Sequence, residues 1–99
     1  MPYEKLMGIQ VVDEELYQKY REAMTPILTR YGGGFRFDFK IKETLRSETD
    51  HEINRVFIIY SKDSESLNAF YHDPEYKAIR QKYFEPAVPK STVISEYNR

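Results

Sequence analysis

The chain has 99 residues, which is enough for one domain, residues 1–99, with a single hydrophobic core. Its 15 basic and 16 acidic residues give a net charge of −1, so no overall field draws it toward nucleic acid or an anionic membrane. The absence of cysteine excludes disulfides, thiolate metal sites and cysteine nucleophiles. No apolar run is long enough for a signal peptide or a membrane span, and we therefore expect a cytoplasmic protein without a membrane partner.

The first expected elements are a strand from Lys5 to Val12 and a long helix. Alternating apolar residues place one face of the strand in the core. Asp13 follows in the position of a helix N-cap, and the glutamates after it suit the positive end of the helix dipole. An apolar stripe at helical spacing predicts the helix: Leu16, Tyr20, Met24, Ile27, Leu28 and Tyr31. Pro26 should kink this helix near Met24 or restart it with Thr25 as the cap.

Three consecutive glycines, Gly32 to Gly34, follow this helix in the stretch RYGGGFRFDF. A phosphate-binding loop needs its glycines before a helix, where backbone N–H groups and the positive end of the dipole face the anion. Here the glycines meet the carbonyl end of a helix, which repels phosphate. We therefore expect Gly32 or Gly33 to end the helix in a left-handed conformation.

Phenylalanine alternates with charged residues from Phe35 to Ile41, which predicts a second strand with one apolar and one charged face. The charged residues are Arg36, Asp38 and Lys40. They either protect an exposed sheet edge against pairing with other chains or line a polar cavity where a dimer closes. We prefer the edge interpretation, and the cavity stays open as an alternative.

A polar stretch from Lys42 to Asn54 predicts a long loop or a ragged hairpin connection. The segment RVFIIY, Arg55 to Tyr60, then predicts a third strand. Because its apolar residues do not alternate with polar ones, this strand should be central and covered on both faces.

The last elements expected are a helix in two segments and a final strand. Serine and aspartate after the third strand cap a short helix that stops at His72. Asp73 and Pro74 then start a second segment, with Asp73 as N-cap and Pro74 in the first helical position. Two prolines, Pro86 and Pro89, should end the helical structure, and the segment STVISEY, Ser91 to Tyr97, predicts the last strand.

The order β-α-β-β-α-β is the split βαβ arrangement of ferredoxin-like α+β folds. Such a fold has a four-stranded antiparallel sheet whose two helices cover one face. The other face would expose apolar residues in a monomer, and exposed apolar patches of that size usually mark an association surface. We therefore expect a homodimer that packs sheet face against sheet face.

Several kinds of functional site are disfavoured by the sequence. The stretch GGGFRFDF resembles an RNA-recognition pattern, but that pattern belongs on the third strand of this order rather than the second, and the net charge is negative. We expect no nucleic-acid partner. The two histidines, His51 and His72, lie in separate loops, so no metal site is expected. No G-x-S-x-G nucleophile motif occurs.

Candidate ligand-binding residues are selected because nine tyrosines in so short a chain favour a pocket wall or an interface. The candidate set is Tyr20, Arg36, Asp38, Tyr71, His72, Asp73, Tyr76 and Arg80. His72 and Asp73 could serve acid–base chemistry, but Asp73 also suits a helix cap and His72 a solvated hinge. Tyr76, Arg80 and Tyr83 share a helix face that is either a pocket wall or a wet interface. No catalytic residue is assigned.

Taken together, several segments resemble one small bacterial family. They are Tyr17, Tyr20 and Pro26 in the first helix, the YGG motif at Tyr31, Arg55 before VFII, and above all FYHDPEYKAIR from Phe70 to Arg80. The resemblance is to the family called domain of unknown function 1330, of the dimeric α/β barrel superfamily, and it covers nearly the whole chain. It implies a ferredoxin-like protomer and a dimer whose two sheets form a barrel. The family has no established catalytic residues.

The wider superfamily includes cofactor-independent monooxygenases, lactone isomerases, polyketide cyclases, haem-degrading enzymes and stress-response proteins, with ligands between the sheet and the helices. Our first hypothesis is a homodimer that binds a small organic molecule in that cleft, without a metal or another cofactor. If it is an enzyme, monooxygenation or isomerisation is the expected class. The rival hypothesis is a structural or regulatory dimer with no ligand pocket, which would have a filled cleft.

Overall fold

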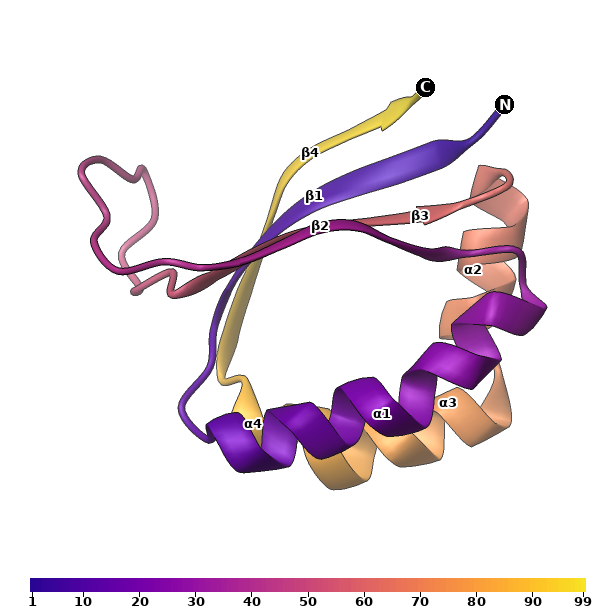
Figure 1. Cartoon of the computed structure of the whole chain (residues 1–99), viewed down its shortest axis with the longest axis horizontal. Coiled ribbons are helices and arrows are strands. Elements are labelled where there is room, and N and C mark those ends of the chain that lie inside the picture. The colour runs from indigo at the N-terminus through magenta and orange to yellow at the C-terminus, as the bar shows by residue number, and fades with distance from the viewer.

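The computed structural model describes residues 1–99 as one four-stranded antiparallel sheet with all helices on one face (Figure 1). The strands are β1 (Tyr3–Gln10), β2 (Gly34–Lys40), β3 (Arg55–Ser61) and β4 (Lys90–Asn98). Their order in the sheet is β2-β3-β1-β4, and each neighbouring pair is antiparallel. This arrangement confirms the ferredoxin-like α+β fold, with β3 as a central strand. The prediction that both faces of β3 are covered is not met within the chain, because the helices cover only one face of the sheet and alternate residues of β3 are only half-buried.

Helix α1 (Glu14–Arg30) begins where the sequence predicts. The Asp13 carboxylate caps it by accepting a hydrogen bond of 3.0 Å from the backbone N–H of Leu16. The helix continues through Pro26, so the restart predicted at Thr25 does not occur. Proline removes one backbone hydrogen bond, and the apolar stripe packed on the sheet outweighs that local loss. The buried residues of the stripe are Tyr17, Tyr20, Met24, Ile27 and Leu28.

The glycines that follow α1 form the predicted left-handed turn. Gly32 has φ +75°, and its N–H donates to the carbonyl of Thr29 while the N–H of Gly33 donates to the carbonyl of Leu28, both at 3.0 Å. These bonds satisfy carbonyls at the end of the helix. A Cβ on Gly33 would lie 2.5 Å from the Tyr60 carbonyl oxygen and 2.6 Å from a Leu28 methyl carbon. The turn therefore requires glycine at two positions for two different reasons.

Strand β2 departs from the predicted alternation at Arg36. Its register with β3 shifts between Phe35 and Phe37, so Phe35 pairs with Ile59 whereas Phe37 pairs with Ile58. A β-bulge of this kind inserts one residue and turns the following side chains to the opposite face. The prediction of one apolar and one charged face is therefore wrong.

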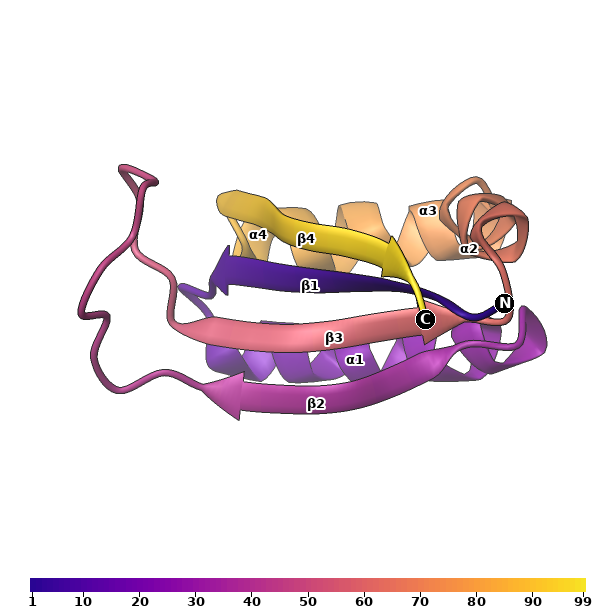
Figure 2. The same cartoon turned by 90° about the horizontal axis from the view of Figure 1, so that it is seen from above.

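The bulge divides the side chains of β2 between the two faces of the sheet. Phe35 and Asp38 lie on the helix side, where Asp38 contacts arginines of α1 and β3. Phe37 and Phe39 stack on each other on the opposite face and are 55% and 53% exposed. Arg36 lies on that same opposite face, which no helix covers (Figure 2). We call this uncovered surface the open face.

The connection from β2 to β3 is a long loop without helix or strand, as predicted, and it extends beyond one end of the sheet (Figure 1). The side-chain amide of Asn54 fixes its base by bonding to both the N–H and the carbonyl of Val11, at 2.8 and 2.9 Å. His51 adds a 2.8 Å hydrogen bond between Nε2 and the hydroxyl of Thr92 on β4.

The second helical layer has four segments: α2 (Ser64–Tyr71), α3 (Pro74–Ile79), the π-helical turn η1 (Arg80–Phe84) and α4 (Glu85–Ala87). Asp73 caps α3 and Pro74 occupies its first turn, as predicted. Pro86 lies inside α4 instead of ending the helix. Since proline crowds the carbonyl one turn earlier, the wider π turn accommodates it. No helix has the length and apolar character needed to cross a membrane.

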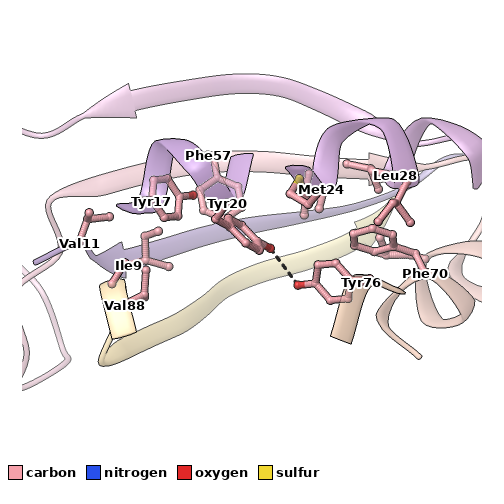
Figure 3. Packing of buried hydrophobic residues seen from close by; sticks show 14 residues of the cluster. Ile9, Val11, Tyr17, Tyr20, Met24, Leu28, Phe57, Phe70, Tyr76 and Val88 are labelled. Atoms are coloured by element: carbon pink, nitrogen blue, oxygen red, sulfur yellow. Dashed lines mark hydrogen bonds between the residues drawn. The ribbon is translucent and has the colours of Figure 1, made fainter. Parts of the chain in front are cut away.

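The core lies between the sheet and the helices (Figure 3). Its 14 buried hydrophobic residues come from every layer: Ile9, Val11, Tyr17, Tyr20, Met24, Ile27, Leu28, Phe57, Ile59, Leu67, Phe70, Tyr76, Ala87 and Val88. Three of them are tyrosines, whose hydroxyls must find polar partners when they are buried. The core therefore contains hydroxyl groups that can take part in a binding site.

We predict that Gly33→Ala destabilises the protein by about 2 kcal/mol, because the new methyl group meets backbone and a packed leucine. Thermal unfolding should show a midpoint lower by about 10 °C. Gly34→Ala is the matched control, since its Cβ would first meet the hydroxyl at the end of the Tyr60 side chain, which can move. Equal losses in the two variants would contradict the steric explanation.

Candidate functional site

A cavity of about 610 Å³ lies between the sheet and the helices. Its wall combines residues of all four strands and of α1, α2, α3, η1 and α4. The apolar part is formed by Met7, Ile9, Met24, Phe35, Phe57, Ile59 and Phe84. Because 11 of its 18 lining residues are hydrophobic and the others are polar or charged, the wall can hold an apolar ligand and orient its polar groups.

Two buried tyrosines of the wall share a hydrogen bond. The hydroxyls of Tyr20 on α1 and Tyr76 on α3 lie 2.8 Å apart, as the dashed line in Figure 3 shows. Either hydroxyl can be the donor. Because this hydrogen bond uses only one of the two hydroxyl hydrogens, the Tyr20–Tyr76 pair keeps the other to donate to a ligand.

Burial sets the protonation state of these hydroxyls. It raises the pKa of Tyr20 well above its ordinary value, and the neighbouring Tyr76 raises it further. Burial also raises the pKa of Tyr71 and Tyr76, which line the same cavity. All three hydroxyls are therefore protonated at neutral pH and serve as hydrogen-bond donors rather than as bases.

Cationic side chains lie on the cavity wall among the tyrosines. The ammonium of Lys5 is 4.9 Å from the ring centre of Tyr71, and Lys77 and Arg80 come from α3 and η1. The carboxylate of Glu85 also lies on the wall and accepts a hydrogen bond of 2.9 Å from Arg80.

Three charged side chains, Asp38, Arg21 and Arg55, form an ion cluster next to Phe35 on the cavity wall. Asp38 accepts two hydrogen bonds of 2.8 Å from Arg55 and one of 3.1 Å from Arg21. Burial raises the pKa of the Asp38 carboxyl, but the two arginines outweigh it and hold the value below its ordinary range. Arg21 also donates from Nε to the hydroxyl of Tyr17 at 2.8 Å. This network fixes the guanidinium of Arg21 on the cavity wall.

Of the candidate residues, four line the cavity: Tyr20, Tyr71, Tyr76 and Arg80. The other four lie elsewhere. Arg36 binds Glu4 on the open face, and Asp38 belongs to the ion cluster. His72 bonds from Nδ1 to the carbonyl of Asn68 at 2.8 Å, at the end of α2. Asp73 caps α3 and accepts a hydrogen bond of 2.7 Å from the Tyr31 hydroxyl.

The wall also contains residues that the candidate set omits: Tyr17, Arg21, Met24 and Phe84. The first three share the α1 face of Tyr20, at helical spacing, and this pattern could have identified them. Phe84 reaches the ring of Tyr20, with centroids 4.9 Å apart, from the π turn. An α-helical pattern assigns the wrong faces across such a turn, so the sequence alone could not place it.

Histidine and acidic side chains form no group of three that could hold a metal ion. The only carboxylate on the wall, Glu85, is paired with Arg80. The geometry therefore supports hydrogen-bond donation to a bound molecule more directly than proton abstraction from it, because a general base must be free to accept a proton.

The fold and the cavity define a small ferredoxin-like protein with a pocket between its sheet and its helices. Residues 6–97 match the model of the family described as domain of unknown function (DUF1330), and the chain belongs to this family. None of the curated proteins matches the chain in sequence.

Solved structures show the same fold. The RPA0582 protein of unknown function from Rhodopseudomonas palustris has 20% identity and a TM-score of 0.80, over 99% of this chain and 82% of that one. A dimeric ferredoxin-like protein of unknown function from Thermobifida fusca has 8% identity and a TM-score of 0.66, over 100% and 92%. A protein from Nitrosomonas europaea, provisionally named an antibiotic biosynthesis monooxygenase, has 12% identity and a TM-score of 0.58, over 99% and 89%.

We predict that Asp38→Asn costs about 1 kcal/mol of stability at pH 7, because it removes the negative charge that two arginines share. The loss is no larger because solvent partly screens this carboxylate. The folded-state pKa of Asp38 is lowered, so its contribution is complete above the unfolded value of about 3.9 and is lost as the pH falls through the folded value. The difference between wild type and variant should therefore shrink in urea titrations below pH 4.

Asp50→Asn in the exposed β2–β3 loop is the control, and we expect it to leave stability nearly unchanged at every pH. A difference between wild type and Asp38→Asn that stayed constant from pH 7 to strongly acidic conditions would contradict the assigned charge interaction.

Proposed function

We propose that the protein is a cytoplasmic homodimer that binds a small organic molecule in the cavity between sheet and helices, without a metal or redox cofactor. One observation carries this proposal: the cavity of about 610 Å³ combines an apolar wall with the hydroxyl groups of four tyrosines. Ligand sites commonly measure about 300–1,000 Å³ and have this composition. A purely structural dimer would need no such space, because close-packed interiors leave few voids.

The protonated tyrosines favour binding over catalysis as the first candidate. Tyr71 and the Tyr20–Tyr76 pair can donate hydrogen bonds to a ligand's oxygen and so polarise a carbonyl. Their raised pKa values keep these hydroxyls protonated at neutral pH, so no phenolate is available to act as a base. Cofactor-independent monooxygenation or isomerisation is the second candidate, and the monooxygenase name of the Nitrosomonas europaea protein supports it. Fold likeness alone does not assign a reaction, so this candidate ranks below binding.

Apolar exposure on the open face supports the homodimer. Its exposed hydrophobic side chains include Phe37, Phe39, Ile94 and Tyr97. In the view of Figure 2 the four strands lie in front of the helices, so a second sheet could approach them directly. The dimeric description of the Thermobifida fusca protein supports the same assembly. Surfaces of this kind commonly associate in water.

The charged residues of the open face are compatible with burial in a dimer. Glu4 is 3% exposed and accepts hydrogen bonds from Arg36, Tyr97 and Arg99. Burial raises the pKa of this carboxyl, but its three donors outweigh the effect and hold the value below the ordinary range. Because the carboxylate is already satisfied within the chain, a second copy can cover it without leaving a buried charge unpaired.

The homodimer predicts a sedimentation mass of about 24 kDa at micromolar concentration, twice the chain mass of 11.9 kDa. Phe37→Glu should shift the protein toward the monomer, because it places an unpaired charge in the apolar contact. Val12→Glu is the matched control, since Val12 is equally apolar, 60% exposed, and lies in the connection between β1 and α1. A wild-type protein that sediments as a monomer would exclude the dimer.

The cavity predicts binding of N-phenyl-1-naphthylamine, a neutral dye that fluoresces in apolar sites. Gln81→Trp should weaken dye binding several-fold, because Gln81 lines the cavity and its side chain is exposed at the rim. Lys82→Trp is the control, since the neighbouring Lys82 is exposed but does not line the cavity. Equal effects of the two substitutions would place the dye elsewhere and contradict the cavity as the binding site.

A further inference from the structure

The charges on the cavity wall are strongly unbalanced. Four cationic residues line it, Lys5, Arg21, Lys77 and Arg80, against the single carboxylate of Glu85. The chain as a whole carries a net charge of −1, so the positive charge of the cavity is local. Charges of one sign in a cleft with low-dielectric walls raise the local concentration of ligands of the opposite sign.

The ion cluster behind the cavity leaves part of this charge uncompensated. Asp38 is shared by Arg21 and Arg55, so one carboxylate serves two guanidinium groups. Glu14 adds a second carboxylate, but it is 53% exposed and lies 3.7 Å from Arg55 and 3.8 Å from Lys40. With Glu14 and Lys40 included, the cluster contains three cations and two anions: Arg21, Arg55 and Lys40 with Asp38 and Glu14.

Arg21 itself has an unused hydrogen-bond donor. Its side chain is 11% exposed, with Nε bonded to the Tyr17 hydroxyl and Nη1 to Asp38. Nη2 is buried and has no acceptor within the chain. Leaving such a donor unsatisfied costs free energy, more so for a charged group. Native structures rarely retain an unpaired buried donor without a reason such as a ligand or an ion.

The surroundings of Arg21 indicate what kind of molecule would supply the acceptor. Its guanidinium carbon lies 3.9 Å from the ring centre of Phe35 and 4.9 Å from that of Phe57, and both rings line the cavity. Because neighbouring side chains cover Nη2, an acid group can reach it only if one of them moves, and the Phe35 ring is the nearest aromatic group. The ring of an aromatic ligand can then pack on the guanidinium where the Phe35 ring packs now, while the acid group of the ligand accepts a hydrogen bond from Nη2.

We propose that the cavity binds an organic anion, an aromatic carboxylic or sulfonic acid whose ring packs on the apolar wall and whose acid group pairs with its cationic residues. This inference rests on the proposed ligand-binding function and adds the chemical class of the ligand. Arg21 and the free hydroxyl hydrogen of the Tyr20–Tyr76 pair donate to the acid oxygens, and Lys77 and Arg80 at the rim attract the anion.

The test compares two dyes of the same shape: 8-anilinonaphthalene-1-sulfonate, an anion, and N-phenyl-1-naphthylamine, which lacks the sulfonate. Arg21→Met should weaken binding of the sulfonate about tenfold and change binding of the neutral dye by less than about twofold, because only the anion loses a charge-assisted hydrogen bond. Asp38 keeps both of its bonds to Arg55 in this variant, which favours folding. Arg30→Met is the matched control on the same helix, exposed and away from the cavity.

A second variant, Lys77→Met with Arg80→Met, tests the proposal even if Arg21→Met does not fold, because both side chains lie toward solvent. It should also weaken the sulfonate selectively, and added salt should reduce the wild-type preference for the anion. If both dyes weaken equally in these variants while Gln81→Trp still blocks the neutral dye, the anion inference is wrong and the cavity function stands. If neither dye responds to Gln81→Trp, the proposed function itself is wrong.

Discussion

The bulge at Arg36 in β2 determines how the two faces of the sheet differ. With Phe35 turned toward the helices, its ring joins the cavity wall beside Arg21. After the extra residue, Asp38 also turns toward the helices and joins two arginines, while Phe37 and Phe39 turn to the open face. A regular strand would have placed all the phenylalanines together and all the charges together. One inserted residue therefore shapes both the cavity and the surface proposed for the dimer.

The helical layer completes the cavity by supplying the wall opposite the sheet. Tyr20 and Tyr76 face each other from α1 and α3, and their shared hydrogen bond satisfies two hydroxyls that would otherwise be buried without partners. The π turn before Pro86 brings Phe84 and Arg80 to the same wall. Rings held at their edges by hydrogen bonds cannot collapse into the space between them as flexible aliphatic chains can.

Charge is used differently on the two faces. On the open face, Glu4 is saturated by donors from its own chain, so that surface presents few unpaired charges to a second copy. On the helix face, cations outnumber carboxylates along the cavity, and Arg21 keeps one buried donor without an acceptor. The paired charges of the open face suit contact with a second copy of the same surface. The excess positive charge of the cavity suits an anionic ligand.

Local sequence patterns alone determined the element order, the caps at Asp13 and Asp73, the glycine turn and the central position of β3, because each depends on residues close in the chain. The candidate residues Tyr20, Tyr71, Tyr76 and Arg80 could be selected in the same way. Only the tertiary structure decided the bulge in β2, the continuity of α1 through Pro26 and the grouping of Arg21 with Asp38 and Arg55. These features depend on register and packing between distant segments, which no local periodicity encodes.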